Sequence, residues 1–168
     1  MSFSSLKRTE ESEAFYKTLL DSLYDGVYYL DRDRTITFWN KGAERLTGYR
    51  KEDVIGRKCN EDILAHMDDG GQNLCELACP AEQAISDGQT RETEVYLRHK
   101  EGHRVPVLVR VSPIRDRAGL IVGAVQVFSD NFSKLEMKRR IEDLHKQSML
   151  DPLTKVANRR AILYVFRR

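Results

Sequence analysis

Apolar residues near the N-terminus recur at helical spacing. Phe15, Leu19 and Leu23 lie four residues apart, so their side chains share one face of a helix. An Asp-Gly pair follows this stripe and provides a break at which the helix can end. The pattern therefore predicts an N-terminal helix within residues 1–24.

The apolar positions that follow alternate or form short runs, as is typical of β-strands. Turn-forming residues separate them, and Asp-Asp-Gly-Gly at residues 68–71 marks a long polar loop. The pattern predicts strands at residues 27–30, 35–39, 92–99, 104–111 and 120–128. It predicts short helices at residues 40–48, 51–55 and 81–86.

The order of these elements predicts an α+β fold: a helix, two strands, short helices, three strands and a final helix. Short turns join the last three strands, which favours an antiparallel arrangement. We expect one sheet with the short helices packed against one face, flanked by N- and C-terminal helices.

A charged helical segment follows the last strand. Met137, Ile141 and Leu144 fall at spacings of four and three, as in a short heptad seam. We therefore expect a linker signalling helix over residues 131–150 that pairs with a second copy in a homodimer. The predicted hinge before it comprises Asp130, Asn131 and Ser133. Either of the last two is suited to cap the helix.

Composition narrows the class of protein. Hydrophobic residues make up 40% and charged residues 32% of the chain, which suits one core with highly charged helices around it. No apolar run approaches the ~20 residues that cross a bilayer, and the polar N-terminus does not resemble a signal peptide. We expect a cytoplasmic chain with no membrane segment. The basic C-terminal part lacks aromatic or groove-reading residues, so nucleic-acid binding is not expected.

The sheet region resembles a PAS domain. Its first half reads GVYYLDRDRTITFWNKGAERLTGYRKEDVIGR, and its second half contains GHRVPVLVRVSPIRD and GLIVGAVQVFSD. The resemblance covers residues 14–130, and we assign the PAS sensory domain to residues 25–130. It implies a five-stranded antiparallel sheet that holds a small cavity under the short helices. PAS domains are sensory and dimerisation modules that bind small molecules, haem, flavin or metals, or nothing.

Aromatic side chains on the first two strands are the candidates for binding a cofactor or an unknown small molecule in that cavity, namely Tyr28, Phe38 and Trp39. The same residues are equally expected in a packed core. Flavin is disfavoured: GRKC at residues 56–59 resembles the start of the photoactive cysteine motif of light-sensing PAS relatives, but the residues after it depart from that motif.

The C-terminal residues DPLTKVANRRA resemble the opening of a GGDEF diguanylate cyclase domain. The resemblance departs at Lys155, where glycine is usual, and we assign residues 151–168 to a truncated start of such a domain. The glycine-rich acidic turn of these cyclases is missing, so we do not expect catalysis by this chain itself. The resemblance implies a PAS sensor that regulates a C-terminal cyclase making cyclic di-GMP in the parent protein.

All three cysteines and one histidine lie in a short polar segment, at Cys59, His66, Cys75 and Cys79. An odd number of cysteines argues against a closed set of disulfides. Three soft thiolates and an imidazole are a plausible tetrahedral ligand set, so one interpretation is a zinc or iron–sulfur site.

Two other interpretations of the cysteines stay open. Pro80 suits the first position of a helix, which would place Cys79 at the helix N-cap, where the helix dipole favours thiolate. Cys75 could then be its redox partner. Alternatively, the thiols are buried apolar groups without chemistry. On that view the chain is a ligand-free PAS dimerisation module.

Overall fold

The computed structural model describes residues 3–61 and 63–149. The chain divides into two compact units, Met1–Asn131 and Phe132–Arg168. The first unit contains the sheet and all helices but the last. The predicted start of a GGDEF domain, residues 151–168, lies outside the described residues.

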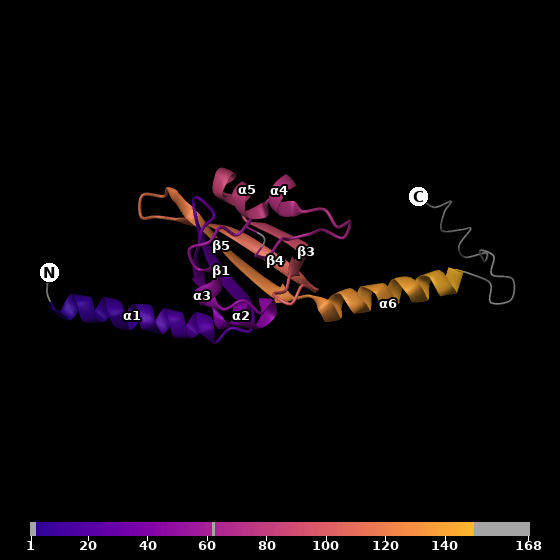
Figure 1. Ribbon diagram of the computed structural model, residues 1–168, viewed down its shortest axis with the longest axis horizontal. Helices are drawn as coiled ribbons and strands as arrows, with labels where there is room; N and C mark the ends of the chain where they lie inside the picture. Colours follow the sequence, from indigo (N-terminus) through magenta and orange to yellow (C-terminus); the bar gives the residue numbers. More distant parts are fainter. Residues whose placement is uncertain (1–2, 62, 150–168) are drawn as a thin grey trace. The chain divides into compact units, whose positions relative to one another are not determined.

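The elements follow the predicted order (Figure 1). The helices are α1 Phe3–Asp21, α2 Lys41–Thr47, α3 Lys51–Val54, α4 Leu74–Leu77, α5 Pro80–Asp87 and α6 Phe132–Met149. The strands are β1 Gly26–Asp31, β2 Ile36–Trp39, β3 Arg91–Arg98, β4 Arg104–Arg115 and β5 Ile121–Asp130. None of the described helices is both long and apolar enough to cross a membrane.

The five strands form one antiparallel sheet in the order β2-β1-β5-β4-β3, which confirms the predicted fold class. Alternate residues of a strand face opposite sides of a sheet. Val107, Val109 and Val111 of β4 are accordingly all buried on one face. They join a single core cluster with Ala43 of α2 and Ala84 of α5, so the short helices cover that face. Figure 1 shows α4 and α5 lying over the sheet.

Asn40 connects three elements at the start of the sheet. Its side chain is fully buried, and its Oδ1 accepts hydrogen bonds from the backbone N–H groups of Val27 and Ala43, both at 2.8 Å. Its Nδ2 donates to the carbonyl oxygens of Leu20 at 2.8 Å and Asp25 at 3.0 Å. The residue is thus the N-cap of α2, as its position in the sequence predicted, and it also fixes the end of α1 and the start of β1.

The N-terminal helix ends at Asp21 rather than at residue 24. Polar side chains of the α2 region bind carbonyl groups at and just beyond the end of this helix. Asn40 donates to the carbonyl of Leu20, and Arg45 donates to that of Leu23 at 2.8 Å. These side chains substitute for the next helical turn. The apolar stripe that predicted the helix remains exposed, with Phe15 62% and Leu19 48% accessible.

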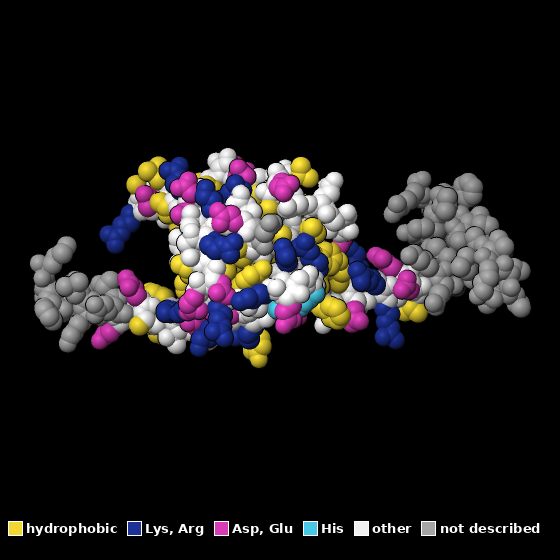
Figure 2. Space-filling model, in the orientation of Figure 1, with side chains coloured by type: hydrophobic (Ala, Val, Ile, Leu, Met, Phe, Trp, Pro, Cys, Tyr) yellow, Lys and Arg dark blue, Asp and Glu magenta, His cyan; other side chains and the backbone are white. Residues whose placement is uncertain are grey.

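Charged side chains of both signs are mixed on the face of the molecule shown in Figure 2. Lys100 pairs with Asp53 at 2.7 Å, and Arg34 pairs with Glu82 at 3.1 Å. Exposed pairs of this kind contribute little to stability. We therefore attribute the stability of this unit mainly to its apolar core and to buried polar groups such as Asn40.

We predict that Asn40→Ala lowers the free energy of unfolding by about 2–4 kcal/mol, because several buried backbone groups lose their partners at once. Urea denaturation followed by circular dichroism measures this change. The matched control is Asn60→Ala at an exposed site, which should change stability by no more than ~0.5 kcal/mol. Equal effects of the two substitutions would contradict the role given to Asn40.

Candidate functional site

Three separate segments bring the cysteines together beneath the short helices. Cys59 lies in the loop after α3, Cys75 lies in α4, and Cys79 is the N-cap of α5, with Pro80 at the first helical position as predicted. Cys59 and Cys79 are buried, Cys75 is half-buried, and all three are free thiols. We call this group the thiol cluster.

The thiols of the cluster lie close enough to influence one another. Burial, together with the neighbouring thiols of Cys79 and Cys75, raises the pKa of Cys59 to about 12. Burial also raises the pKa of Cys75, although a hydrogen bond with the His66 backbone opposes this shift. Cys59 and Cys75 are therefore neutral thiols near pH 7.

Arg34, which the sequence did not single out, and Tyr28, a predicted cofactor-binding residue, complete the surroundings of the cluster. The Arg34 guanidinium hydrogen-bonds the Cys79 side chain; burial opposes the effect, but this contact and the charge of Glu82 raise the pKa of Arg34. The Tyr28 hydroxyl donates to Oε1 of Gln126 on β5. Burial and then the three thiols raise the pKa of Tyr28 well above its usual value. No local sequence pattern predicts that Arg34, which lies in a turn with φ of 64°, contacts a cysteine.

The His66 imidazole lies near the charge of Arg104, although the His66 backbone contacts Cys75. Its imidazole is buried, and burial together with the positive charge of Arg104 lowers the pKa of His66 to about 4. Its Nε2 atom has no hydrogen-bond partner. The three predicted thiols thus lie near one another, whereas the shift at His66 comes from burial and Arg104 rather than from a thiol. Over residues 3–61 and 63–149, no three of the four predicted metal ligands have ligand atoms that all lie within 4.8 Å of one another.

The predicted aromatic cofactor residues fall on two faces of the sheet. Tyr28 and Trp39 are buried together, with ring centroids 5.3 Å apart, and Phe128 lies 6.0 Å from Tyr28. Phe38 instead packs against Tyr29 at 4.9 Å on the opposite face, because neighbouring residues of a strand point to opposite sides. The prediction that Phe38 lines the same cavity as Tyr28 is therefore wrong. Tyr28 and Trp39 form part of the packed core.

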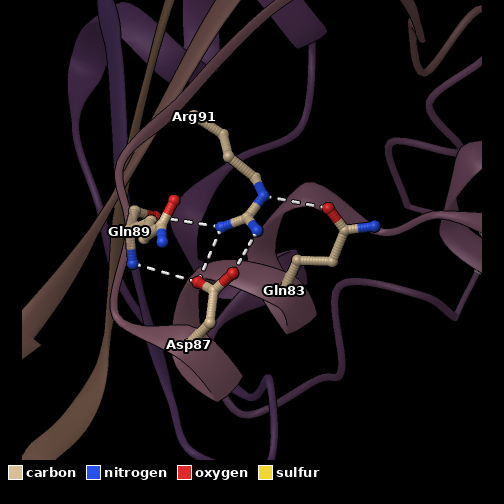
Figure 3. Close-up of polar contacts among 4 residues, drawn as sticks. All are labelled: Gln83, Asp87, Gln89 and Arg91. Atoms are coloured by element: carbon tan, nitrogen blue, oxygen red, sulfur yellow. Dashed lines mark hydrogen bonds and ion pairs between the residues drawn. The ribbon is translucent and has the colours of Figure 1, made fainter.

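A polar clamp holds the helix that carries Cys79 (Figure 3). Arg91, the first residue of β3, makes a two-pronged ion pair with Asp87 at the end of α5 and donates from Nε to Gln83 at 2.9 Å. Asp87 accepts hydrogen bonds from the Arg91 side chain and the Gln89 backbone, and these lower the pKa of Asp87 to about 2. The clamp joins α5 to the sheet and so fixes the helix whose N-terminus is Cys79.

A surface pocket of about 300 Å³ lies beside the thiol cluster. Residues of α4 and α5 and the short link between them line it, among them Cys79 and Glu82. The pocket gives Cys79 an approach from solvent even though the residue is only 7% exposed. A small reagent can therefore reach the cluster from this side.

The predicted hinge coincides with the boundary between the two compact units, which falls after Asn131. The Asn131 backbone N–H donates to the Pro106 carbonyl at 3.0 Å, and its buried Nδ2 has no partner. Because α6 begins at Phe132, Ser133 lies inside the first helical turn and Asn131 directly precedes it. Ser133 is therefore not the N-cap. Asp130 ends β5.

The apolar side chains predicted to form a helix seam are exposed on α6. Met137 is 66%, Ile141 50% and Leu144 58% accessible. Their spacing places them on one face of the helix, with charged residues elsewhere. This face is open to solvent in the single chain.

Comparison with known proteins connects this architecture to sensory proteins. The PAS fold family model matches residues 14–130. The chain is 28% identical over 150 residues to the probable diguanylate cyclase DgcE of Escherichia coli K12, covering 89% of this chain and 13% of that protein. It is 23% identical over 153 residues to the signal transduction histidine-protein kinase AtoS of the same organism, covering 85% and 22%.

Among solved structures, the PAS domain of a protein from Colwellia psychrerythraea is similar, with a TM-score of 0.59 and 26% identity. That match covers 70% of this chain and 94% of the other. The chain spans less than a quarter of the length of the two curated relatives.

We predict that Cys59 makes stability fall at alkaline pH. The pKa of its thiol is 9.0 as a reference and about 12 when folded. Between these values the unfolded chain releases the proton and the folded chain keeps it, so stability decreases as pH rises from about 9 to about 12, by up to ~1.4 kcal/mol per pH unit. Urea denaturation of Cys59→Ala across this range should give a shallower decline than that of the unaltered chain.

The control for this measurement is Ser86→Ala, which changes an exposed side chain of α5 and leaves the thiols intact. Its alkaline decline should match that of the unaltered chain. If the Cys59→Ala curve ran parallel to both, Cys59 would not be the buried titrating group.

Proposed function

The chain belongs to the PAS family of sensory signalling domains, and we propose that it is the input domain of a diguanylate cyclase whose signal is received at the thiol cluster. Two observations support the output assignment. A probable diguanylate cyclase is among the relatives, and DPLTKVANRRA follows the signalling helix at residues 151–161. The proximity of Cys59, Cys75 and Cys79, whose thiols influence one another's pKa, supports the input assignment.

A soft metal centre is the input chemistry that this donor set supports best. Thiolate sulfurs suit zinc and iron–sulfur centres, and here they come from three segments that a shared ion would draw together. Cys59, Cys75 and Cys79 would hold the metal, which would supply the positive charge that keeps buried thiolates deprotonated. We leave His66 out of the ligand set because burial and the charge of Arg104, and not a thiol, shift the pKa of its imidazole.

Thiol oxidation is the second candidate input, and the position of Cys79 favours it. The sulfur lies at the N-terminus of α5, and the Arg34 guanidinium hydrogen-bonds it. A peroxide would convert Cys75 and Cys79 to a disulfide, taking two electrons and two protons from the thiols and leaving as two water molecules (for hydrogen peroxide). The pocket beside Cys79 offers the approach for such an oxidant.

A continuous route leads from the cluster to the signalling helix. The three thiols act on Tyr28, whose hydroxyl is hydrogen-bonded to Gln126 in the middle of β5. β5 continues to Asp130, and α6 begins two residues later at Phe132. A change of charge at the thiols would therefore alter a buried hydrogen bond on the strand that leads into α6. A signal shifts the two states only if it binds them unequally.

Exposed apolar side chains on both terminal helices support the homodimer part of the proposal. Phe15 and Leu19 on α1, and Met137 and Ile141 on α6, are each at least 48% accessible. Burying such side chains against a second copy is favourable. A cyclase that joins two GTP molecules needs two active sites side by side, so the pairing of α6 helices is a suitable control point.

We expect chain purified without chelator to carry about one zinc or iron per chain at the thiol cluster, measured by elemental analysis. Cys75→Ser should remove it, whereas His66→Ala should leave it bound. Cobalt(II) substitution should give the sulfur-to-metal charge-transfer absorption of a thiolate site. In the parent protein, Cys75→Ser should abolish the difference in cyclase activity between metal-loaded and metal-free forms.

If the purified chain holds no metal, and mass spectrometry shows a Cys75–Cys79 disulfide after peroxide treatment, thiol oxidation would replace metal binding as the proposed input. Metal-free chain with three thiols that stay reduced would overturn the sensing proposal. The protein would then act as a dimerisation module. Loss of metal in His66→Ala would show that the histidine is a ligand after all.

A further inference from the structure

The β3–β4 hairpin carries a second group of potential metal ligands, far along the sequence from the thiol cluster. His99 follows β3 and His103 precedes β4, and the His99 N–H donates to the His103 carbonyl at 2.9 Å. The Gly102 N–H donates to the His99 carbonyl at 2.8 Å, and Gly102 has φ of 93°. Such a three-residue loop closed by a left-handed glycine is a common hairpin form. It sets the two histidines opposite each other.

The side chains of this hairpin converge. The His99 and His103 rings stack with centroids 4.2 Å apart and an angle of 23° between their planes. Nδ1 of His99 lies 3.8 Å from Oε2 of Glu101. In the part of the chain that the structure describes, His99, Glu101 and His103 are the only group of three such residues whose ligand atoms all lie within 4.8 Å of one another.

The hydrogen bonding of His99 leaves two acceptors facing each other. The Glu101 backbone N–H donates to Nδ1 of His99 at 3.2 Å, so that nitrogen carries a lone pair and not a proton in this arrangement. The carboxylate of Glu101 is also an acceptor when ionised. Two acceptors at this separation repel unless a cation lies near both, and 3.2 Å is a long hydrogen bond that is easily exchanged.

The hairpin is anchored independently of any ion. The His99 side chain is only 15% accessible and lies against Gly48, where an added Cβ would be 2.7 Å from the ring. The Lys100 N–H donates to the Thr47 carbonyl at 2.8 Å, and its ammonium pairs with Asp53 at 2.7 Å. Lys100, the cationic residue next to Glu101 in the sequence, therefore pairs with Asp53 and not with Glu101. His103 and Glu101 are exposed and free to adjust.

We propose that His99, Glu101 and His103 bind a divalent transition-metal ion of the zinc class at the surface end of the β3–β4 hairpin. Two imidazoles and one carboxylate are ligands that zinc accepts, with water completing the tetrahedron. Metal–ligand bonds of about 2.0–2.2 Å place neighbouring ligand atoms ~3.3 Å apart. Rotation of the exposed side chains closes the remaining gap. Figure 2 shows histidine atoms at the surface beside acidic side chains.

Calorimetric titration of the intact chain with zinc tests this site, and cobalt(II) identifies its ligands. Binding at the hairpin should add about one equivalent whose cobalt spectrum lacks thiolate charge transfer. His103→Ala and Glu101→Gln should each weaken this equivalent by at least roughly tenfold, a loss that even outer-shell changes can cause. Cys75→Ser should leave it unchanged, so the outcome is independent of the thiol cluster.

His145→Ala on α6 and Glu92→Gln on β3 are the matched controls, because they remove the same chemical groups at other exposed positions. Neither should change zinc affinity. The proposal would be overturned if every bound metal ion showed thiolate absorption. It would also be overturned if both His103→Ala and Glu101→Gln bound zinc as tightly as the unaltered chain. Circular dichroism should show that all four variants keep the fold, since each changed side chain is exposed.

Discussion

A single buried amide holds the start of the PAS domain in register. The buried Asn40 side chain accepts two hydrogen bonds and donates two, and every partner is a backbone group. Buried backbone groups without partners are costly, so no apolar side chain of similar size can substitute. The end of α1, the first strand and the N-terminus of α2 are thus positioned by one residue. β1 in turn pairs with β5 in one antiparallel register.

That register also decides where the chemistry lies. β1 against β5 places Tyr28 opposite Gln126, on the face covered by the short helices. The thiols reach the same face from the loop and from the N-terminus of α5, which Arg91 holds to the sheet. The hairpin histidines lie at the surface instead. The protein therefore carries its cysteine thiols where burial disfavours charge, and two histidines and a carboxylate at the end of the β3–β4 hairpin.

Much of the fold follows from patterns within short stretches of chain. Alternating apolar residues predicted the strand at 104–111, whose Val107, Val109 and Val111 are buried, and Pro80 predicted Cys79 as an N-cap. Boundaries were less certain: the first helix stops earlier than its apolar stripe suggested, because side chains far along the sequence bind its last carbonyl groups. Helix ends depend on such partners as well as on local propensity.

The sequence by itself determined the family, the order of the elements and the gathering of cysteines in one segment, since periodicity and spacing are properties of neighbouring residues. Only the tertiary structure decided which side chains meet. It turned His66 toward Arg104, set Arg34 against Cys79 and placed Phe38 on the far face of the sheet. These contacts depend on side-chain direction and on the packing of distant segments, and neither is encoded in the spacing of residues along the chain.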